Sequence, residues 1–242
     1  MLSKLVKKAG EPVVRQAMLH AMKILGHQFV IGRDIKEAMK TARPQEKLGY
    51  RYSYDMLGEA ARTMQDADRY FKAYVDAIDA IGKTVQGYDE APSPITSAGI
   101  SVKLSALHPR YEVAQEASVM RDLVPRLRAL ALLAKSAGMG LNVDAEEADR
   151  LGLSLDVIEK VLSEPALSGW DGFGIVVQAY GPRAGVVLDT LYDMAKRHNR
   201  RIMVRLVKGA YWDTEIKRAQ VEGIDGFPVF TRKAATDVSY IA

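Results

Sequence analysis

The sequence predicts an α/β fold, either an open five-stranded parallel sheet or a β/α barrel that ends after its fifth strand. Five short apolar runs each end in polar or charged residues, and a helical pattern follows each of them. Such runs are typical of parallel strands joined by helical crossovers. They start about 30 to 50 residues apart, as βαβ units do, and a closed eight-stranded barrel would need on the order of 100 residues more. The runs are Tyr52–Asp55, Gly99–Lys103, Gly140–Asp144, Gly172–Gln178 and Arg201–Val207.

Residues 1–50 carry no strand pattern and are predicted to form a helical arm ahead of the sheet, which would occupy residues 51–242. Apolar residues recur at helical spacing between Pro12 and Gly26, which predicts an amphipathic helix. A second, shorter helix is expected from Asp34 to about Ala42.

Local start and stop signals place the remaining helices. Thr63 and Asp66 have the spacing of a capping box at the head of a helix. Glycine, proline and serine between Gly87 and Ser97 predict a loop. The later signals are apolar spacing from Val119 to Leu133 before Gly138, Ser154 as a helix cap, Pro182 as a helix opening, Asp213 as a cap with Gly223 as the helix end, and a last helix near Thr236.

Composition limits the classes of function. With 48% hydrophobic residues among 242, the chain can bury a sizeable core, and the absence of cysteine excludes disulfides and thiolate chemistry. The 34 basic residues are interleaved with 30 acidic ones, so we expect no nucleic acid partner. No apolar run reaches the roughly 18 residues of a membrane span, and Met1–Lys8 lacks the apolar core of a signal peptide. We therefore expect a cytoplasmic location, with peripheral attachment to the inner membrane left open.

The end of the fifth predicted strand combines cations, small residues and aromatic rings. Arg205 and Lys208 are followed by Gly209–Trp212, where the backbone can approach a ligand closely and a helix begins. Cations and a helix N-terminus together favour an anion or phosphate site, and the aromatic rings can flank a planar ligand. The alternative is that the two cations are ordinary strand-end charges paired with Asp144 and Glu146.

Two other strand ends carry charges that suit chemistry. Lys103 ends the second strand, where a lysine can bind a carboxylate or act as a Schiff-base nucleophile, and an ion pair with Asp55 is the structural alternative. The acidic segment Asp144–Glu147 suits a general base or a metal ligand, but it equally suits charges at a helix start. The four histidines have no paired spacing, so no metal site is predicted.

At this point five segments carry a family resemblance. They are similar to the proline dehydrogenase domain of the bifunctional proline utilization A family, in the same order and over nearly the whole chain. The resemblance implies a distorted (βα)8 TIM-like barrel, cut short after its fifth strand and preceded by a helical arm. It also implies FAD as the cofactor and oxidation of L-proline to Δ1-pyrroline-5-carboxylate, the first step of proline catabolism to glutamate. The segments are Gly10–Gln16, Tyr52–Ala60, Val102–Tyr111, Asn142–Arg150 and Arg205–Asp213.

The resemblance assigns roles to individual residues. Lys103 would contact the proline carboxylate and Tyr211 would pack on the proline ring. Asp144 would lie beside flavin and substrate, and Arg205 would hydrogen-bond the flavin near N5, where it would stabilise the negative charge of the reduced flavin as hydride arrives. The other expected flavin contacts are Ala145, Gln178, Lys208, Gly209, Ala210, Trp212 and Thr231.

The resemblance also implies partners. In the family, the last barrel strands and the following helix supply an arginine pair for the substrate and further FAD contacts, and this chain is expected to be the first two-thirds of the domain. Glu59 matches a glutamate that pairs with one of those arginines, so we expect it to lack that partner. The implied partners are L-proline, a quinone or other electron acceptor, the C-terminal part of the domain and an aldehyde dehydrogenase domain. Two alternatives stay open: a Schiff-base barrel lyase using Lys103 or Lys208, and a non-catalytic fragment with an exposed sheet edge.

Overall fold

The computed structural model describes residues 10–26, 29–85 and 93–242 and divides the chain into two compact units, Met1–Tyr50 and Arg51–Ala242. The segment Met1–Lys8 and the first part of the predicted loop, Gly87–Pro92, lie outside the described residues. Within the described ranges, no helix is both long enough and apolar enough to cross a membrane.

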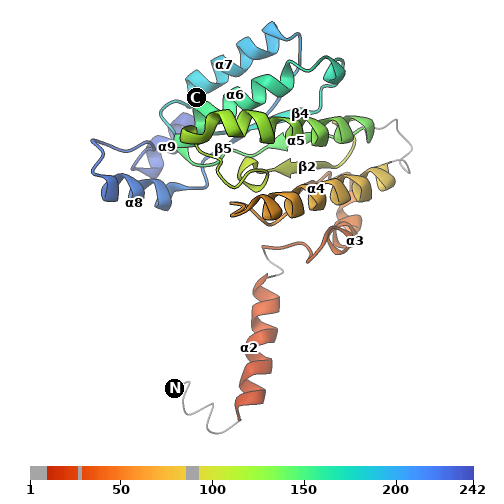
Figure 1. Ribbon diagram of the computed structural model, residues 1–242. Coiled ribbons are helices and arrows are strands. Elements are labelled where there is room, and N and C mark those ends of the chain that lie inside the picture. The colour runs from red at the N-terminus through yellow and green to blue at the C-terminus, as the bar shows by residue number, and fades with distance from the viewer. Residues whose placement is uncertain (1–9, 27–28, 86–92) are drawn as a thin grey trace. The chain divides into compact units, whose positions relative to one another are not determined.

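Within its described residues, 10–26 and 29–50, the first unit contains two helices. Helix α2 (Glu11–Gly26) forms where the helical spacing predicted it, and α3 (Ile35–Glu46) begins after Asp34 (Figure 1). The Asp34 carboxylate caps α3 by accepting a backbone N–H of its first turn at 2.9 Å. Helix α3 runs past its predicted end through Pro44, because a proline in the last turn removes only one backbone donor.

The second unit is built on a five-stranded sheet in which every neighbouring pair is parallel and the strand order follows the sequence. All five predicted strands are confirmed. A doubly wound sheet reverses its strand order to place helices on both faces, whereas a barrel adds strands sequentially. The order therefore favours the barrel over the open sheet. The strands are β1 (Ser53–Asp55), β2 (Gly99–Val102), β3 (Leu141–Val143), β4 (Phe173–Gln178) and β5 (Met203–Val207).

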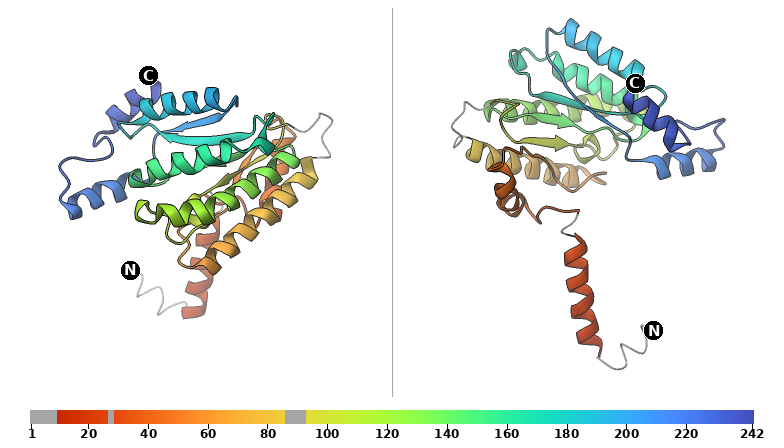
Figure 2. Two further views of the ribbon diagram at one scale, coloured as in Figure 1. Left: turned by 45° about the horizontal axis from the view of Figure 1, so that its top comes forward. Right: turned by 180° about the vertical axis from the view of Figure 1, so that it is seen from behind.

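Four helices that connect the strands lie in succession on one face of the sheet: α4 (Met64–Val85), α5 (Glu116–Ser136), α6 (Leu151–Leu162) and α7 (Ala184–Arg197) (Figures 1 and 2). After β5 the chain continues into α8 (Trp212–Glu222) and α9 (Lys233–Ile241). Short 3-10 turns occupy Leu104–Ala106, Val113–Gln115, Ala148–Arg150 and Pro165–Leu167.

The two faces of the sheet differ in chemistry. Strand residues that face the helices are apolar and buried, among them Ile100, Val102, Leu141 and Phe173, each no more than 1% exposed. Because side chains alternate along a strand, the other positions share the opposite face. Nearly continuous apolar runs favour strands with apolar side chains on both faces, but here the face away from the helices is largely polar. Its polar members are Ser53, Asp55, Ser101, Lys103, Asn142, Gln178 and Arg205, with Asp144 directly after β3.

Two local signals act as predicted. The Thr63 hydroxyl accepts the Asp66 N–H at 3.0 Å, and the Asp66 carboxylate accepts the Thr63 N–H at 3.1 Å, which is the reciprocal pattern of a capping box. At the other end of the unit, Gly223 ends α8 in the left-handed conformation with φ of 62°.

Two predicted caps are wrong. Ser154 lies inside α6 and donates to the Leu151 carbonyl at 2.7 Å, and Asp213 lies in the first turn of α8 rather than before it. A tertiary contact explains the first case, because the Glu215 carboxylate of α8 accepts the Ala148 N–H at 2.6 Å and so binds the free N–H of the turn that leads into α6. For Asp213, nothing in the surrounding contacts explains why α8 begins two residues earlier than a cap at Asp213 would predict.

Candidate active site

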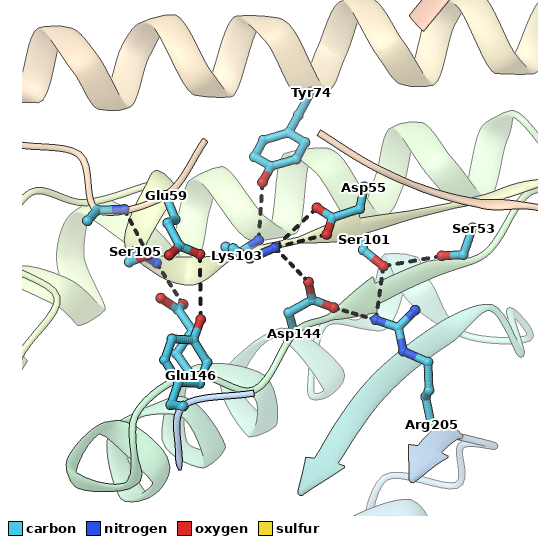
Figure 3. A network of polar contacts seen from close by, with 12 residues as sticks. Ser53, Asp55, Glu59, Tyr74, Ser101, Lys103, Ser105, Asp144, Glu146 and Arg205 are labelled. Carbon is cyan, nitrogen blue, oxygen red and sulfur yellow. Dashed lines mark hydrogen bonds and ion pairs between the residues drawn. The ribbon is translucent and has the colours of Figure 1, made fainter. Parts of the chain in front are cut away.

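The carboxyl ends of the strands bring four charged side chains into one network on the polar face of the sheet (Figure 3). Asp55 ends β1, Lys103 follows β2, Asp144 follows β3, and Arg205 lies on β5. Parallel strands place their carboxyl ends at one edge, so hydrogen bonds of this network join residues as far as 104 positions apart in the chain, Ser101 and Arg205.

Lys103 is the centre of the network. Its Nζ atom lies 3.1 Å from both carboxylate oxygens of Asp55 and 3.0 Å from Oδ2 of Asp144. Burial alone would lower the pKa of Lys103, but the adjacent Asp144 and Asp55 carboxylates outweigh it and raise the pKa above its ordinary value. Lys103 is therefore a stable ammonium ion at neutral pH, and all three of its N–H donors have an acceptor.

Asp144 joins this lysine to Arg205. Its second oxygen accepts the Arg205 guanidinium at 2.5 Å, and its side chain is only 12% exposed. The predicted alternative of an Arg205–Asp144 ion pair is thus observed. Arg205 keeps 39% of its side chain exposed, so part of the guanidinium remains available to a ligand.

Uncharged groups fix these side chains in place. Arg205 also donates to the Ser101 hydroxyl at 3.1 Å, and Ser101 shares a hydrogen bond with Ser53 at 3.2 Å. Tyr74 of α4 accepts the backbone N–H of Lys103 at 3.2 Å. Sequence reasoning overlooked both serines, although each lies two residues before a charged strand end and therefore on the same face.

Glu146 has a different role from the one that its position suggested. Its carboxylate accepts the Ser105 N–H at 3.0 Å and pairs with Arg150 at 3.3 Å, so it is not a partner of Arg205 or Lys208. Burial raises the pKa of Glu146 above its ordinary value.

The turn after β5 is held by backbone contacts. Gly209 has φ of 143°, and a Cβ atom there would lie 2.2 Å from the Tyr180 ring. The Gln178 amide bridges two segments, because its oxygen accepts the Ala210 N–H at 2.8 Å and its nitrogen donates to the Glu146 carbonyl at 2.9 Å. Glu146 is the neighbour of Ala145 in the segment that follows β3. The two contacts therefore fix the position of Ala210 relative to that segment.

Three predicted cofactor residues lie in or near contacts between this turn and the segment from Phe230 to Asp237. Lys208 pairs with Asp237 of α9 at 2.5 Å instead of joining the Asp144 network. Trp212 donates its indole N–H to the Phe230 carbonyl at 2.8 Å, which places Thr231, the residue after Phe230, close to the start of α8.

Tyr211 lies closer to the charged network. Its hydroxyl donates to the Glu59 carboxylate at 3.5 Å, so Glu59, which we expected to lack its family partner, contacts a tyrosine here. Burial, reinforced by the negative charges of Glu146 and Glu59, raises the pKa of Tyr211. The phenol is therefore neutral at physiological pH and keeps the O–H that it donates to Glu59.

The structure thus brings together Lys103, Asp144 and Arg205 directly, and it links Gln178 with Ala210. The predicted set omitted Asp55 as a site residue, although its position at a strand end was the available signal. Among the described residues, no His, Cys, Asp or Glu side chains gather as a set of metal ligands.

Comparisons with known proteins agree on one family. The family model described as proline dehydrogenase matches residues 38–242. Among curated proteins, the "Bifunctional protein PutA" of Salmonella typhimurium is 55% identical and that of Escherichia coli 54% identical, each over 241 residues. These alignments cover 100% of this chain but 18% of each relative, so the chain spans about a fifth of their length.

Solved structures give the same result. A crystal structure of a mutant of proline utilization A from Bradyrhizobium japonicum is 54% identical, with a TM-score of 0.83, and the match covers 98% of this chain and 24% of that one. Proline utilization A from Bdellovibrio bacteriovorus, inactivated by N-propargylglycine, is 29% identical with a TM-score of 0.88, covering 94% of this chain and 24% of that one.

Proposed function

Because the chain belongs to the proline dehydrogenase family and has its TIM-like β/α fold, we propose that it forms the part of an FAD-dependent enzyme that oxidises L-proline to Δ1-pyrroline-5-carboxylate. This would be the first step of proline catabolism to glutamate. The observation that carries the proposal is the Lys103–Asp144–Arg205 network, which presents two cations at the carboxyl ends of parallel strands on the face opposite the helices.

The residues present fit a flavin. Arg205 is a partly exposed cation, and Gly209 lets the backbone turn without a side chain between β5 and α8. Trp212, 41% exposed, offers an aromatic surface beside this turn. The flavin would supply the two-electron acceptor, taking hydride at N5. Residues that would hold it are Ala145, Gln178, Arg205, Lys208, Gly209, Ala210, Trp212 and Thr231.

Substrate binding would use the centre of the network. Lys103 carries a permanent positive charge that can hold the proline carboxylate, and Tyr211 supplies a ring to pack on the pyrrolidine. Asp144 uses one oxygen for each cation, so it would hold Lys103 in place for the substrate and Arg205 in place for the flavin. The protein would thereby hold the two reacting rings in a fixed relation, which lowers the entropic part of the barrier.

The lyase alternative is disfavoured by the charge state of both lysines. A Schiff base requires a neutral amine, yet the pKa of Lys103 is raised by Asp144 and Asp55. The pKa of Lys208 is likewise raised, first by its hydrogen bond to Asp237. Carboxylates adjoin both lysines, Asp144 and Asp55 at Lys103 and Asp237 at Lys208, and they stabilise the charged ammonium rather than the neutral amine.

We also propose the partners that the family resemblance implies. Electrons would pass from the reduced flavin to a quinone or another acceptor. The curated relatives are named bifunctional and are much longer than this chain, which agrees with an aldehyde dehydrogenase domain, and with further strands of the barrel, in the same polypeptide.

The test is the visible absorbance of the protein, purified in the full length in which it occurs, before and after anaerobic addition of proline. A yellow protein whose flavin band is bleached by proline, but not by glycine, is the expected result. A yellow protein that proline does not bleach would reject the substrate. A colourless protein that borohydride inactivates in the presence of a carbonyl compound would instead favour the lyase.

A further inference from the structure

Lys103 already holds two carboxylates, and these differ in how firmly they are held (Figure 3). Asp144 is 12% exposed and also accepts Arg205, so removing it from Lys103 would leave a nearly buried charge with one cation fewer. Asp55 is 46% exposed and contacts Lys103 with both oxygens at 3.1 Å. In the part of the chain that the structure describes, Lys103 is the cation with which Asp55 forms an ion pair.

A ligand carboxylate cannot simply be added to this arrangement. The three N–H donors of the Lys103 ammonium are occupied, and a third carboxylate beside it would be repelled by the two already present. One of the two must leave. Asp55 can leave at the lower cost, because its own carboxylate is 46% exposed and can turn into water, whereas Asp144, 12% exposed, would stay behind as a nearly buried charge.

The geometry points to Asp55 as a displaceable counter-ion that occupies, on Lys103, the position that the substrate's carboxylate takes. This inference rests on the proposed function, since it assumes that Lys103 binds the carboxylate of an amino acid. Asp55 then sets the affinity of the subsite, because every carboxylate ligand competes with it for Lys103. While the subsite is empty, Asp55 neutralises the Lys103 ammonium and holds it in position.

The test compares two halves of the substrate on the FAD-loaded protein in its natural full length. Cyclopentanecarboxylate carries the ring and the carboxylate without the nitrogen, and pyrrolidine carries the ring and the nitrogen without the carboxylate. Dissociation constants are measured by titration calorimetry and by the perturbation of the flavin spectrum. In Asp55→Asn we expect cyclopentanecarboxylate to bind about three- to tenfold more tightly, the range of a weak ion pair, with pyrrolidine unchanged.

Three controls separate displacement from a general effect of charge. Asp55→Glu keeps the carboxylate and should stay within about twofold of the wild type. Asp171→Asn removes a similarly exposed aspartate, paired with Arg201, that precedes β4 and so lies at the opposite edge of the sheet, and it should change nothing. In a Lys103→Met background, Asp55→Asn should lose its effect, because no ammonium remains for which the carboxylates compete.

The outcomes are distinct. Unchanged or weaker binding of cyclopentanecarboxylate in Asp55→Asn overturns the inference, and so does tighter binding that persists in the Lys103→Met background. Weaker binding of pyrrolidine with unchanged cyclopentanecarboxylate would assign Asp55 to the substrate amine and also overturn it. Absence of proline oxidation in the wild type would refute the proposed function, whereas the binding constants test Asp55 separately.

Discussion

The Arg205 guanidinium of β5 donates to the Asp144 carboxylate after β3 at 2.5 Å, across the intervening strand β4. The contact links two residues 61 positions apart in the chain. Arg205, which we assign to the flavin, is thereby linked to Asp144, which also contacts Lys103. A change at Arg205 or at Asp144 should therefore affect both flavin binding and substrate binding.

Replacing Arg205 with methionine should slow the reduction of flavin by proline about 100-fold or more and make the flavin potential more negative, because a cation that stabilises the reduced flavin is lost. Stopped-flow reduction and redox titration measure the two effects. In Arg205→Lys the flavin potential should lie between those of the wild type and Arg205→Met. Arg201 is an exposed arginine just before the same strand, and Arg201→Met should leave the flavin potential unchanged. A wild-type potential in Arg205→Met would remove the electrostatic role.

Replacing Lys103 with methionine should raise the KM for proline about 10- to 100-fold, the range of a lost hydrogen bond to a charged group. FAD content should stay near normal, because Lys103 is assigned to the substrate. Steady-state kinetics and the flavin-to-protein absorbance ratio check both statements. A covalent adduct trapped at Lys103 by borohydride would contradict this assignment.

Replacing Gly209 with alanine should lower FAD retention and destabilise the turn by about 1 to 3 kcal/mol, because the residue is in a strained region and its Cβ would lie 2.2 Å from the Tyr180 ring. The matched control is Gly152→Ala on α6, where a Cβ meets nothing within 4 Å. That change should stabilise the protein by about 0.4 to 1 kcal/mol. Equal melting temperatures and FAD content in the two variants would show that Tyr180 can move aside.

Stability should fall between pH 10 and 12, and Tyr74 should account for part of the fall. Burial raises the pKa of Tyr74 to about 12, so in this window the unfolded tyrosine, with a pKa of about 10, ionises while the folded one stays neutral. The loss should amount to about 2 to 3 kcal/mol. In Tyr74→Phe the unfolding free energy should decline less steeply over this range, although the variant is less stable at pH 8 because the Lys103 N–H loses its acceptor. Equal slopes in urea titrations would contradict the assignment.

Residues 1–242 expressed alone should associate or aggregate, retain FAD weakly and fail to oxidise proline. Strand β5 pairs only with β4 among the described strands, and Val204 of β5 is 44% exposed, so an edge and an apolar position are open. Because the face of the sheet away from the helices is polar, the loss of stability should be smaller than it would be for an apolar face. Light scattering, melting curves and a proline assay decide the matter. A monomer that melts cooperatively and turns over proline would show that five strands suffice.

The strands and most helix boundaries could be predicted because their signals are local. Apolar runs, the Thr63 capping box and Gly223 act within a few residues, and alternation along each run could have identified the polar face. The sequential sheet order follows from the repeated βα pattern. The start of α6 could not be predicted locally, because the N–H of Ala148 in the turn before this helix is bound by Glu215, which is distant in sequence.

Sequence by itself determined that Lys103, Asp144 and Arg205 would lie towards one edge of a parallel sheet, because Lys103 and Asp144 directly follow strands and Arg205 lies in the second half of the fifth predicted run. Only the tertiary structure decided how they pair. In it, Asp144 pairs with both Lys103 and Arg205, Asp55 pairs with Lys103, and Asp237 pairs with Lys208. The physical reason is that a strand pattern fixes the edge and the face on which a side chain lies, whereas an ion pair depends on distances across neighbouring strands that no local pattern encodes.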